Sequence, residues 1–152
     1  MAGSNTTGQA ETTGTFPVQA SALKVGGYVV IHGAPCRVVT THTTKVGKHG
    51  HAKTTYTGVD IFTKQRHEDT CPATHKVLVP EVGRFEGQVV GVDDGYITLL
   101  LEDGTTRADL RVPSGSAGDE LLDRFNSDNV VIATVQCCLG RESVIDSKVA
   151  KE

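Results

Sequence analysis

Turn signals recur along the chain at short intervals, and this spacing constrains the fold more than any other feature. They include Gly26-Gly27, Gly33-Ala34-Pro35, Asp93-Asp94-Gly95 and Glu102-Asp103-Gly104. The segments between them are short and rich in Val, Ile and Thr. Short β-branched segments bounded by Gly, Pro and Asp are typical of strands joined by tight turns. The sequence therefore predicts an all-β protein.

A first module is predicted over residues 15–82, after a polar tail at residues 1–14 that is expected to be disordered. Its predicted strands are 28–31, 36–43, 53–62, 67–71 and 76–79, with Val59 and Ile61 on one face of the third strand. Five short strands at this spacing, with no helical segment between them, are typical of a small barrel.

A second module is predicted over residues 83–152, with strands at 87–92, 96–101, 105–112 and 130–139. A short helix before the last of these strands begins near Ser114 or Ser116, either of which can cap it, and Leu121, Leu122 and Phe125 form its inward stripe. Residues 142–149 are compatible with a short helix or with a frayed strand. The order of these elements is typical of a five-stranded OB-type barrel with one short helix.

The two modules differ in charge. Residues 1–82 hold 8 Lys and Arg against 5 Asp and Glu, a net charge of +3, whereas residues 83–152 hold 7 against 13, a net charge of −6. This difference suggests that the two modules have different neighbours. The basic module can contact phosphates, although a charge of this size does not give tight binding alone.

Composition favours a cytoplasmic protein without a membrane partner. No apolar segment approaches the roughly 20 residues that a membrane-spanning helix needs. The polar N-terminus lacks the basic start and apolar core of a secretory signal. The four cysteines show no framework spacing and are expected to be reduced, as in a cytosolic protein: Cys36, Cys71, Cys137 and Cys138.

The segment Lys45–Lys53 has the most unusual composition. Its nine residues include three lysines, two histidines and two glycines, and no acid. Because β-branched residues flank it on both sides, it is predicted to be the tip of a hairpin in which Gly47 and Gly50 form the turn and Lys48 reaches into solvent. A tip this basic suggests contact with an anionic partner or chemistry on a lysine.

A zinc site is the main alternative use of this region. His49-x-His51 and Cys71-x-x-x-His75 supply ligand types, and His42 and Cys36 are near in sequence. The three lysines of the tip repel a dication, so no metal site is expected, and Cys36 and Cys71 are expected to be small core residues.

The sequence shows no pattern that indicates an enzyme. Gly47-Lys48 lacks the earlier glycine and the following Ser or Thr of a phosphate-binding loop. Cys71 and His75 have the residue types of a nucleophile and its base, but no orienting acid stands at a defined place. The chain is therefore expected to be a binding protein and not a catalyst.

The tip sequence Lys-x-Gly-Lys-His-Gly-His-Ala-Lys resembles the hypusine loop of the eukaryotic translation initiation factor five-A family, the homologues of bacterial elongation factor P. Further similar segments are Thr15-Phe16-Pro17, Gly33-x-Pro35-Cys36, Asp60-Ile61-Phe62-Thr63, Glu68-Asp69-x-Cys71-Pro72-x-Thr74-His75, Val79-Pro80, Asp94-Gly95-Tyr96 and Arg107-x-Asp109-Leu110-Arg111-x-Pro113. The resemblance covers nearly all of residues 15–152. It implies an SH3-like barrel, with the hypusine loop at residues 44–53, joined to an OB-fold barrel.

The resemblance also implies a modification and a set of partners. In that family, deoxyhypusine synthase transfers an aminobutyl group from spermidine to one loop lysine, and deoxyhypusine hydroxylase then hydroxylates it. The matching residue is Lys48, and no separate cofactor is implied. The loop residues expected to contact tRNA and the ribosome are Lys45, Gly47, His49, Gly50, His51 and Lys53.

The function implied is that of a translation factor at the exit site of the ribosome, in contact with ribosomal RNA. Modified Lys48 would reach the acceptor end of peptidyl-tRNA and promote peptide-bond formation at stalled sequences, or termination. The alternative is a zinc- or RNA-binding module without lysine modification.

Overall fold

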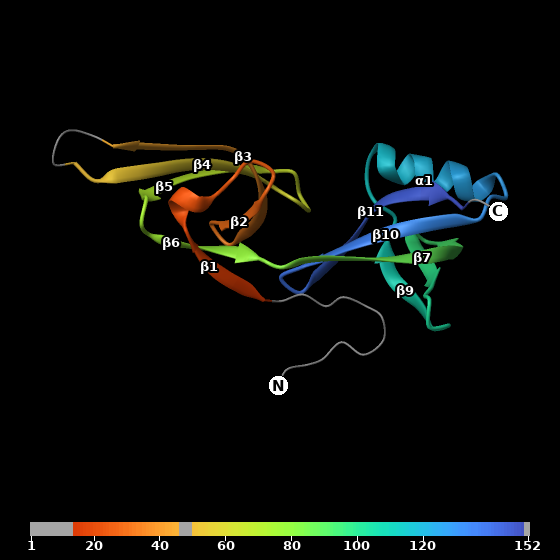
Figure 1. The fold of residues 1–152 in the computed structure, drawn as a ribbon. Coiled ribbons are helices and arrows are strands. Elements are labelled where there is room, and N and C mark those ends of the chain that lie inside the picture. The colour runs from red at the N-terminus through yellow and green to blue at the C-terminus, as the bar shows by residue number, and fades with distance from the viewer. Residues whose placement is uncertain (1–13, 46–49, 151–152) are drawn as a thin grey trace. The chain divides into compact units, whose positions relative to one another are not determined.

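The computed structural model describes residues 14–45 and 50–150. Its contacts divide the chain into two compact units, with the division between Glu81 and Val82. Each unit is built mainly from antiparallel strands, and both appear in Figure 1.

The N-terminal unit holds six strands and one short 3-10 helix. They are β1 (Thr15–Gln19), η1 (Ala20–Ala22), β2 (Tyr28–Ile31), β3 (Ala34–Lys45), β4 (Ala52–Asp60), β5 (Arg66–Pro72) and β6 (Lys76–Pro80). Strands β2, β3, β4 and β5 form one sheet in that order, and β1 pairs with β6. The four-stranded sheet curls, as Figure 1 shows, and gives the SH3-like barrel predicted for this unit.

The sequence did not predict β1 and η1. Strand β1 contains Pro17, which lacks a backbone N–H and is therefore confined to edge strands. The structure satisfies this limit, because β1 pairs only with β6. Residues 20–22 are too few to show a helical period.

The first hairpin turn lies one residue earlier than predicted. His32 and Gly33 both have positive φ angles, 52° and 78°, so they form the two-residue turn, and Ala34 and Pro35 already belong to β3. Two consecutive residues with positive φ are typical of a type I′ turn, whose twist matches that of the strands it joins.

The core of the N-terminal unit contains a tyrosine that the sequence pattern did not indicate. Alternate residues Thr54, Tyr56 and Gly58 of β4 are buried, whereas Val59 is only half-buried. Val59 therefore does not lie on the buried face of β4, and Ile61, which is buried, lies in the turn after this strand. The buried core is aliphatic apart from Tyr56 and Cys36: Ala20, Leu23, Val29, Ile31, Cys36, Val38, Tyr56 and Val77.

The C-terminal unit holds five strands and one α-helix. They are β7 (Val82–Asp93), β8 (Tyr96–Leu100), β9 (Thr106–Arg111), α1 (Ser116–Asn126), β10 (Val131–Cys138) and β11 (Arg141–Val149). The sheet order is β11-β10-β7-β8-β9. Arg107 of β9 bonds to Glu142 of β11, which brings the two outer strands together. This is the predicted five-stranded OB fold with one short helix.

The α-helix begins differently from the prediction. Gly115 occupies the N-cap position with a φ of 74°, and no side chain caps the helix, so neither Ser114 nor Ser116 has the predicted role. Arg124 fixes the other end of α1 on the sheet, because its Nη1 donates to the Ser147 carbonyl at 2.6 Å and to Ser147 Oγ at 2.9 Å. The inward stripe is correct for Leu121, which is fully buried, while Leu122 and Phe125 are partly buried.

The C-terminal segment is a strand, which decides between the two possibilities left by the sequence. Residues Arg141–Val149 pair with β10 along its whole length, and Val144 and Ser147 are buried. Among residues 14–45 and 50–150, no helix has the length and apolar character needed to cross a membrane.

Candidate functional site

The predicted hypusine loop lies at the end of a projecting hairpin. We define the arm as residues 40–45 of β3 and 52–57 of β4, which pair as far as Lys45 and Ala52. Strand β5 runs beside β4 along the arm, and Pro72 pairs with Lys53. Figure 1 shows β3 and β4 extending side by side away from the curled part of the sheet. The arm is therefore three-stranded close to its end and not an isolated hairpin.

Threonine side chains join the strands of the arm. Thr43 Oγ1 and Thr54 Oγ1 are 2.8 Å apart across β3 and β4, and Thr54 is fully buried. Thr55 Oγ1 and Thr70 Oγ1 are 2.9 Å apart across β4 and β5. Cross-strand Thr–Thr pairs each stabilise a sheet by roughly 0.2–1 kcal/mol, and β-branched side chains have few rotamers. These bonds stiffen the arm without adding apolar surface to it.

The end of the arm is also bonded to the rest of the N-terminal unit. The amide of Ala73, in the β5–β6 turn, donates to the carbonyl of Ala52 at 2.9 Å. The carbonyl of Ala73 in turn accepts from Ser21 N of η1 at 3.1 Å. Ala52 is the paired residue of β4 nearest to the tip, so these two bonds connect the base of the tip to η1.

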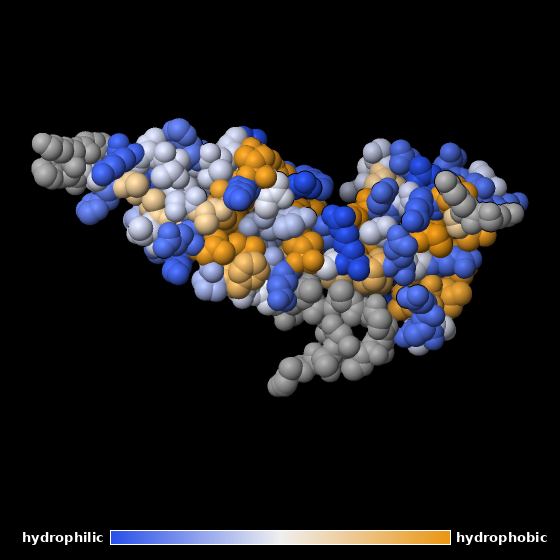
Figure 2. Space-filling view, viewed as in Figure 1, coloured by the Kyte–Doolittle hydropathy of each residue, from blue (hydrophilic) through white to orange (hydrophobic). Residues whose placement is uncertain are grey.

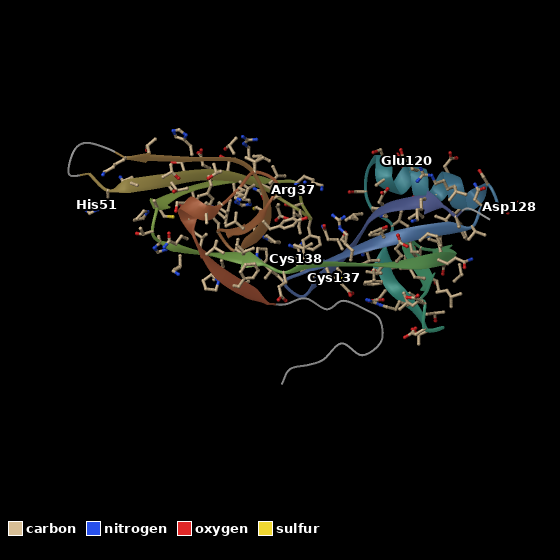
Figure 3. All side chains as sticks on the ribbon, in the orientation of Figure 1. Arg37, His51, Glu120, Asp128, Cys137 and Cys138 are labelled. Carbon is tan, nitrogen blue, oxygen red and sulfur yellow. The ribbon has the colours of Figure 1, made fainter. Side chains whose placement is uncertain are left out.

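Cationic side chains lie on both faces of the arm. Lys45 pairs with Ala52 whereas Lys53 pairs with Thr44, so the two lysines point to opposite faces. Both are exposed, as is His51, which Figure 3 shows at the end of the arm. Gly50 is half-buried. None of the ion pairs among the described residues involves Lys45 or Lys53, so both charges remain available to an anionic partner.

The central lysine itself is outside the described residues. Lys48 falls in the segment 46–49, together with predicted site residues Gly47 and His49. The structure therefore describes Lys45, Gly50, His51 and Lys53 of the predicted loop and the arm that carries it. Figure 2 shows hydrophilic and pale residues on the visible face of the arm, in agreement with its Thr, Lys and His content.

Two thiols belong to the N-terminal unit, Cys36 in its core and Cys71 on β5 beside the arm, and neither is activated. Burial first, and the nearby charge of Asp60 second, raise the pKa of the Cys36 thiol to about 11. Burial also raises the pKa of Cys71, against the opposing effect of a hydrogen bond from Tyr56. The pKa of Tyr56 is raised, first by burial and then by the charges of Cys71 and Asp69. Because the thiolate is the nucleophile, these shifts give no support to catalysis by either cysteine.

The residues considered for zinc are not brought together. Cys36 is in the core, His42 is exposed on the arm and His75 is exposed in the β5–β6 turn. Over the described ranges, no group of three or more His, Cys, Asp or Glu side chains is placed to hold a metal ion. His49 belongs to the segment that is not described.

The sequence pattern predicted the cationic residues but not the hydrogen bonds that support the arm. The bonds Thr43–Thr54, Thr55–Thr70 and Ala73–Ala52 depend on strand register, which a sequence pattern leaves open. The signal that was present is the clustering of threonines on both sides of the tip, from Thr40 to Thr44 and from Thr54 to Thr57.

Two family models match consecutive parts of the chain. "Translation initiation factor 5A-like, N-terminal" matches residues 13–75. "Eukaryotic elongation factor 5A hypusine, DNA-binding OB fold" matches residues 81–148. The two matches fall one in each structural unit.

Curated proteins and solved structures agree with these matches. Eukaryotic translation initiation factor 5A-1 of Schizosaccharomyces pombe is 45% identical over 138 residues, which are 91% of this chain and 88% of that protein. The Spodoptera exigua protein is 43% identical over 143 residues, 93% of this chain and 89% of the relative. A solved structure of a translation initiation factor eif-5a family protein from Naegleria fowleri has a TM-score of 0.82 and 40% identity, covering 89% of this chain and 99% of that one. The chain therefore belongs to the eukaryotic translation initiation factor 5A family of translation factors.

Proposed function

We propose that Lys48 carries hypusine and that the arm presents it to the ribosome. The observation that carries this proposal is the arm itself, a three-stranded extension joined by threonine bonds, with a lysine on each face. Its two strands end at Lys45 and Ala52, on either side of the segment 46–49 that contains Lys48. The family description that matches this chain includes the word hypusine, which supports the modification.

The modification suits the position of the lysine. Deoxyhypusine synthase would transfer the four-carbon aminobutyl group of spermidine to Lys48 Nζ: the C–N bond between this group and the secondary amine of spermidine breaks, a new C–N bond forms at Nζ, and 1,3-diaminopropane leaves. Deoxyhypusine hydroxylase would then convert one C–H bond of the added group to C–OH, with molecular oxygen as the oxidant; one oxygen atom enters the side chain and the other is reduced to water by a reductant supplied to that enzyme. The product has a second amine well beyond the first and a hydroxyl that can donate and accept hydrogen bonds. A side chain of this length enters a narrow RNA-walled channel that would not admit a whole loop.

The partners follow from this chemistry. Modified Lys48 would contact the acceptor end of peptidyl-tRNA from the exit site of a cytoplasmic ribosome. Lys45, His51 and Lys53 would contact phosphates of tRNA and ribosomal RNA around it, through contacts that weaken as salt increases. The ribosome would remain the catalyst, and this protein would hold the reacting end in position at stalled sequences or during termination.

The proposal is tested by exchanging the central lysine in a cell that has been depleted of its own factor. Lys48→Arg keeps the charge but cannot be modified, so we expect the variant to fold and to lose rescue of growth and of translation through proline runs. Lys45→Arg is the matched control, because it keeps a cation on the same arm, and we expect it to rescue. Full rescue by Lys48→Arg would contradict the proposal.

The same set of variants separates the alternative function. A zinc- or RNA-binding module without modification would retain its RNA affinity in Lys48→Ala and lose it in His49→Ala or Cys71→Ala. The hypusine proposal predicts that Lys48→Ala causes the largest loss of ribosome binding, larger than the loss in His49→Ala or Cys71→Ala.

A further inference from the structure

Two histidines far apart in the sequence meet on the N-terminal unit, away from the tip of the arm. The ring centroids of His32 and His67 are 5.6 Å apart, and their planes are inclined at 68°. His32 is exposed in the β2–β3 turn, and His67 is half-buried on β5. Strands β2 and β5 are the two outer strands of the four-stranded sheet, so the pair lies where the curled sheet brings its edges together.

A glycine helps to bring these edges together. His67 pairs with Gly58 of β4. A Cβ at Gly58 would lie 2.7 Å from Cys36 Cβ and 3.1 Å from Ile31 Cδ1, so a neighbouring side chain takes the space that a larger residue would need. Ile31 is the last residue of β2, and His32 follows it directly. The missing side chain at Gly58 therefore lets the end of β2 approach β5.

The ring nitrogens of the pair are available to a ligand. Among the described residues, neither imidazole takes part in an ion pair or in a hydrogen bond. Arg66 and Glu68 flank His67 in sequence, and their side chains therefore project from the opposite face of β5. A neutral imidazole carries one lone pair on a ring nitrogen and is a common ligand of transition metals.

The separation of the rings fits a shared metal ion. With a metal–nitrogen distance of about 2.0–2.1 Å, the ring centroids of two imidazoles on one tetrahedral ion lie roughly 5 Å apart. The observed 5.6 Å is close to this value, although the present contact is edge-to-face. His32 is exposed, so rotation about its χ2 angle would direct a ring nitrogen at the shared ion. We propose that His32 and His67 form a two-imidazole site for a divalent transition ion such as Zn²⁺, with water in the remaining positions.

The bound ion would cross-link two parts of the barrel. A bound ion would join the β2–β3 turn to β5, the strand that supports β4 along the arm. It would stabilise the N-terminal unit without using any residue of the hypusine loop. From the sequence no metal site was predicted, and His32 and His67 were not among the candidate ligands because they belong to different elements of the fold.

The test uses the full chain and Zn²⁺ alone. His49 and His51 of the tip could bind Zn²⁺ independently, so the starting protein carries His49→Gln and His51→Gln. The measurement follows the ring ¹⁵N signals of the four remaining histidines during titration. We expect the signals of His32 and His67 to shift together with one saturation curve, and those of His42 and His75 to stay in place.

Single variants complete the test. His32→Asn suits the positive φ of this position, since Asn tolerates it well, and His67→Gln replaces the partner. We expect each to weaken Zn²⁺ binding at least tenfold, while His42→Gln and His75→Gln leave it unchanged. Unshifted signals of His32 and His67, or equal binding by His32→Asn, would overturn the proposal. Melting curves without metal check that each variant is folded.

Discussion

The guanidinium of Arg107 donates two hydrogen bonds to the carboxylate of Glu142. The distances are 3.1 Å from Nη1 to Oε2 and 2.6 Å from Nη2 to Oε1. Arg107 also donates to Asp109, from Nε at 3.0 Å and from Nη2 at 2.7 Å. Its side chain is only 16% exposed and that of Glu142 19%, so the bond that joins β9 to β11 is largely shielded from water.

Arg107→Met should destabilise the C-terminal unit. Breaking a largely buried pair leaves the Glu142 carboxylate with only the weak Cys137 thiol donor in place of the guanidinium. A loss of about 3 kcal/mol is typical of such a change. The loss is measured in urea through the amide NMR signals of β10, which report unfolding of this unit. Arg111→Met is the matched control on the same strand. It removes only the contact with the Tyr96 ring, 4.8 Å away, and should cost about 1 kcal/mol or less.

The Asp109 contact should make this stability depend on acid pH. Hydrogen bonds from Arg107 lower the pKa of Asp109 in the folded state. The stabilisation is therefore complete above the unfolded pKa of about 3.9 and is lost as the pH falls through the lower folded value. Asp109 is 65% exposed, so its contribution is about 1 kcal/mol at most.

The measurement compares the wild-type protein with Asp109→Asn in urea from pH 7 to pH 2.5. The difference in the free energy of unfolding should be constant near neutral pH and should shrink below about pH 4. A difference that grows as the pH falls would have the wrong sign for this explanation.

The positions of β8, β9 and β10 followed closely from the sequence, whereas β7 begins at Val82 instead of residue 87 and the helix boundary was not predicted. The Asp94-Gly95 and Asp103-Gly104 turns fix the ends of β8, because glycine takes the positive φ of 82° and 88° found there. The start of α1 depends on a packing contact that no local pattern shows. Gly118 is needed there so that the helix can approach the carbonyl oxygen of Pro113. Gly115 takes the positive φ of 74° at the N-cap, and the serines beside it are left without a capping role.

Gly118→Ala should destabilise the protein, against the usual trend. Within a helix, alanine is normally more favourable than glycine by about 1 kcal/mol. Here the added Cβ would overlap the carbonyl oxygen of Pro113, which belongs to the backbone and cannot turn aside. We expect a loss of at least about 2 kcal/mol in urea unfolding.

The matched control for this substitution is Gly91→Ala in β7. A Cβ at Gly91 would have its nearest atom, Thr98 Cβ, at 3.7 Å, which is ordinary contact. Its effect should remain within about 1 kcal/mol. Equal effects of the two substitutions would show that the Pro113 contact does not decide the outcome.

The charged residues of the candidate site were predictable from the sequence, but the strand pairing and hydrogen bonds that hold them were not. Lys45, His51 and Lys53 stand out by composition alone, since few surface loops collect cations without an acid. That the two lysines lie on opposite faces follows from the pairing of Lys45 with Ala52, which requires the register of β3 and β4. The approach of His32 to His67 depends on the curl of the whole sheet, which a local pattern does not carry.

Modification of Lys48 is tested most directly by the mass of the peptide that contains it, taken from protein purified from its native cell. We expect Lys48 alone to carry the added mass of an aminobutyl group plus one oxygen atom, with Lys45 and Lys53 unmodified. Native protein in which Lys48 is entirely unmodified would contradict this expectation.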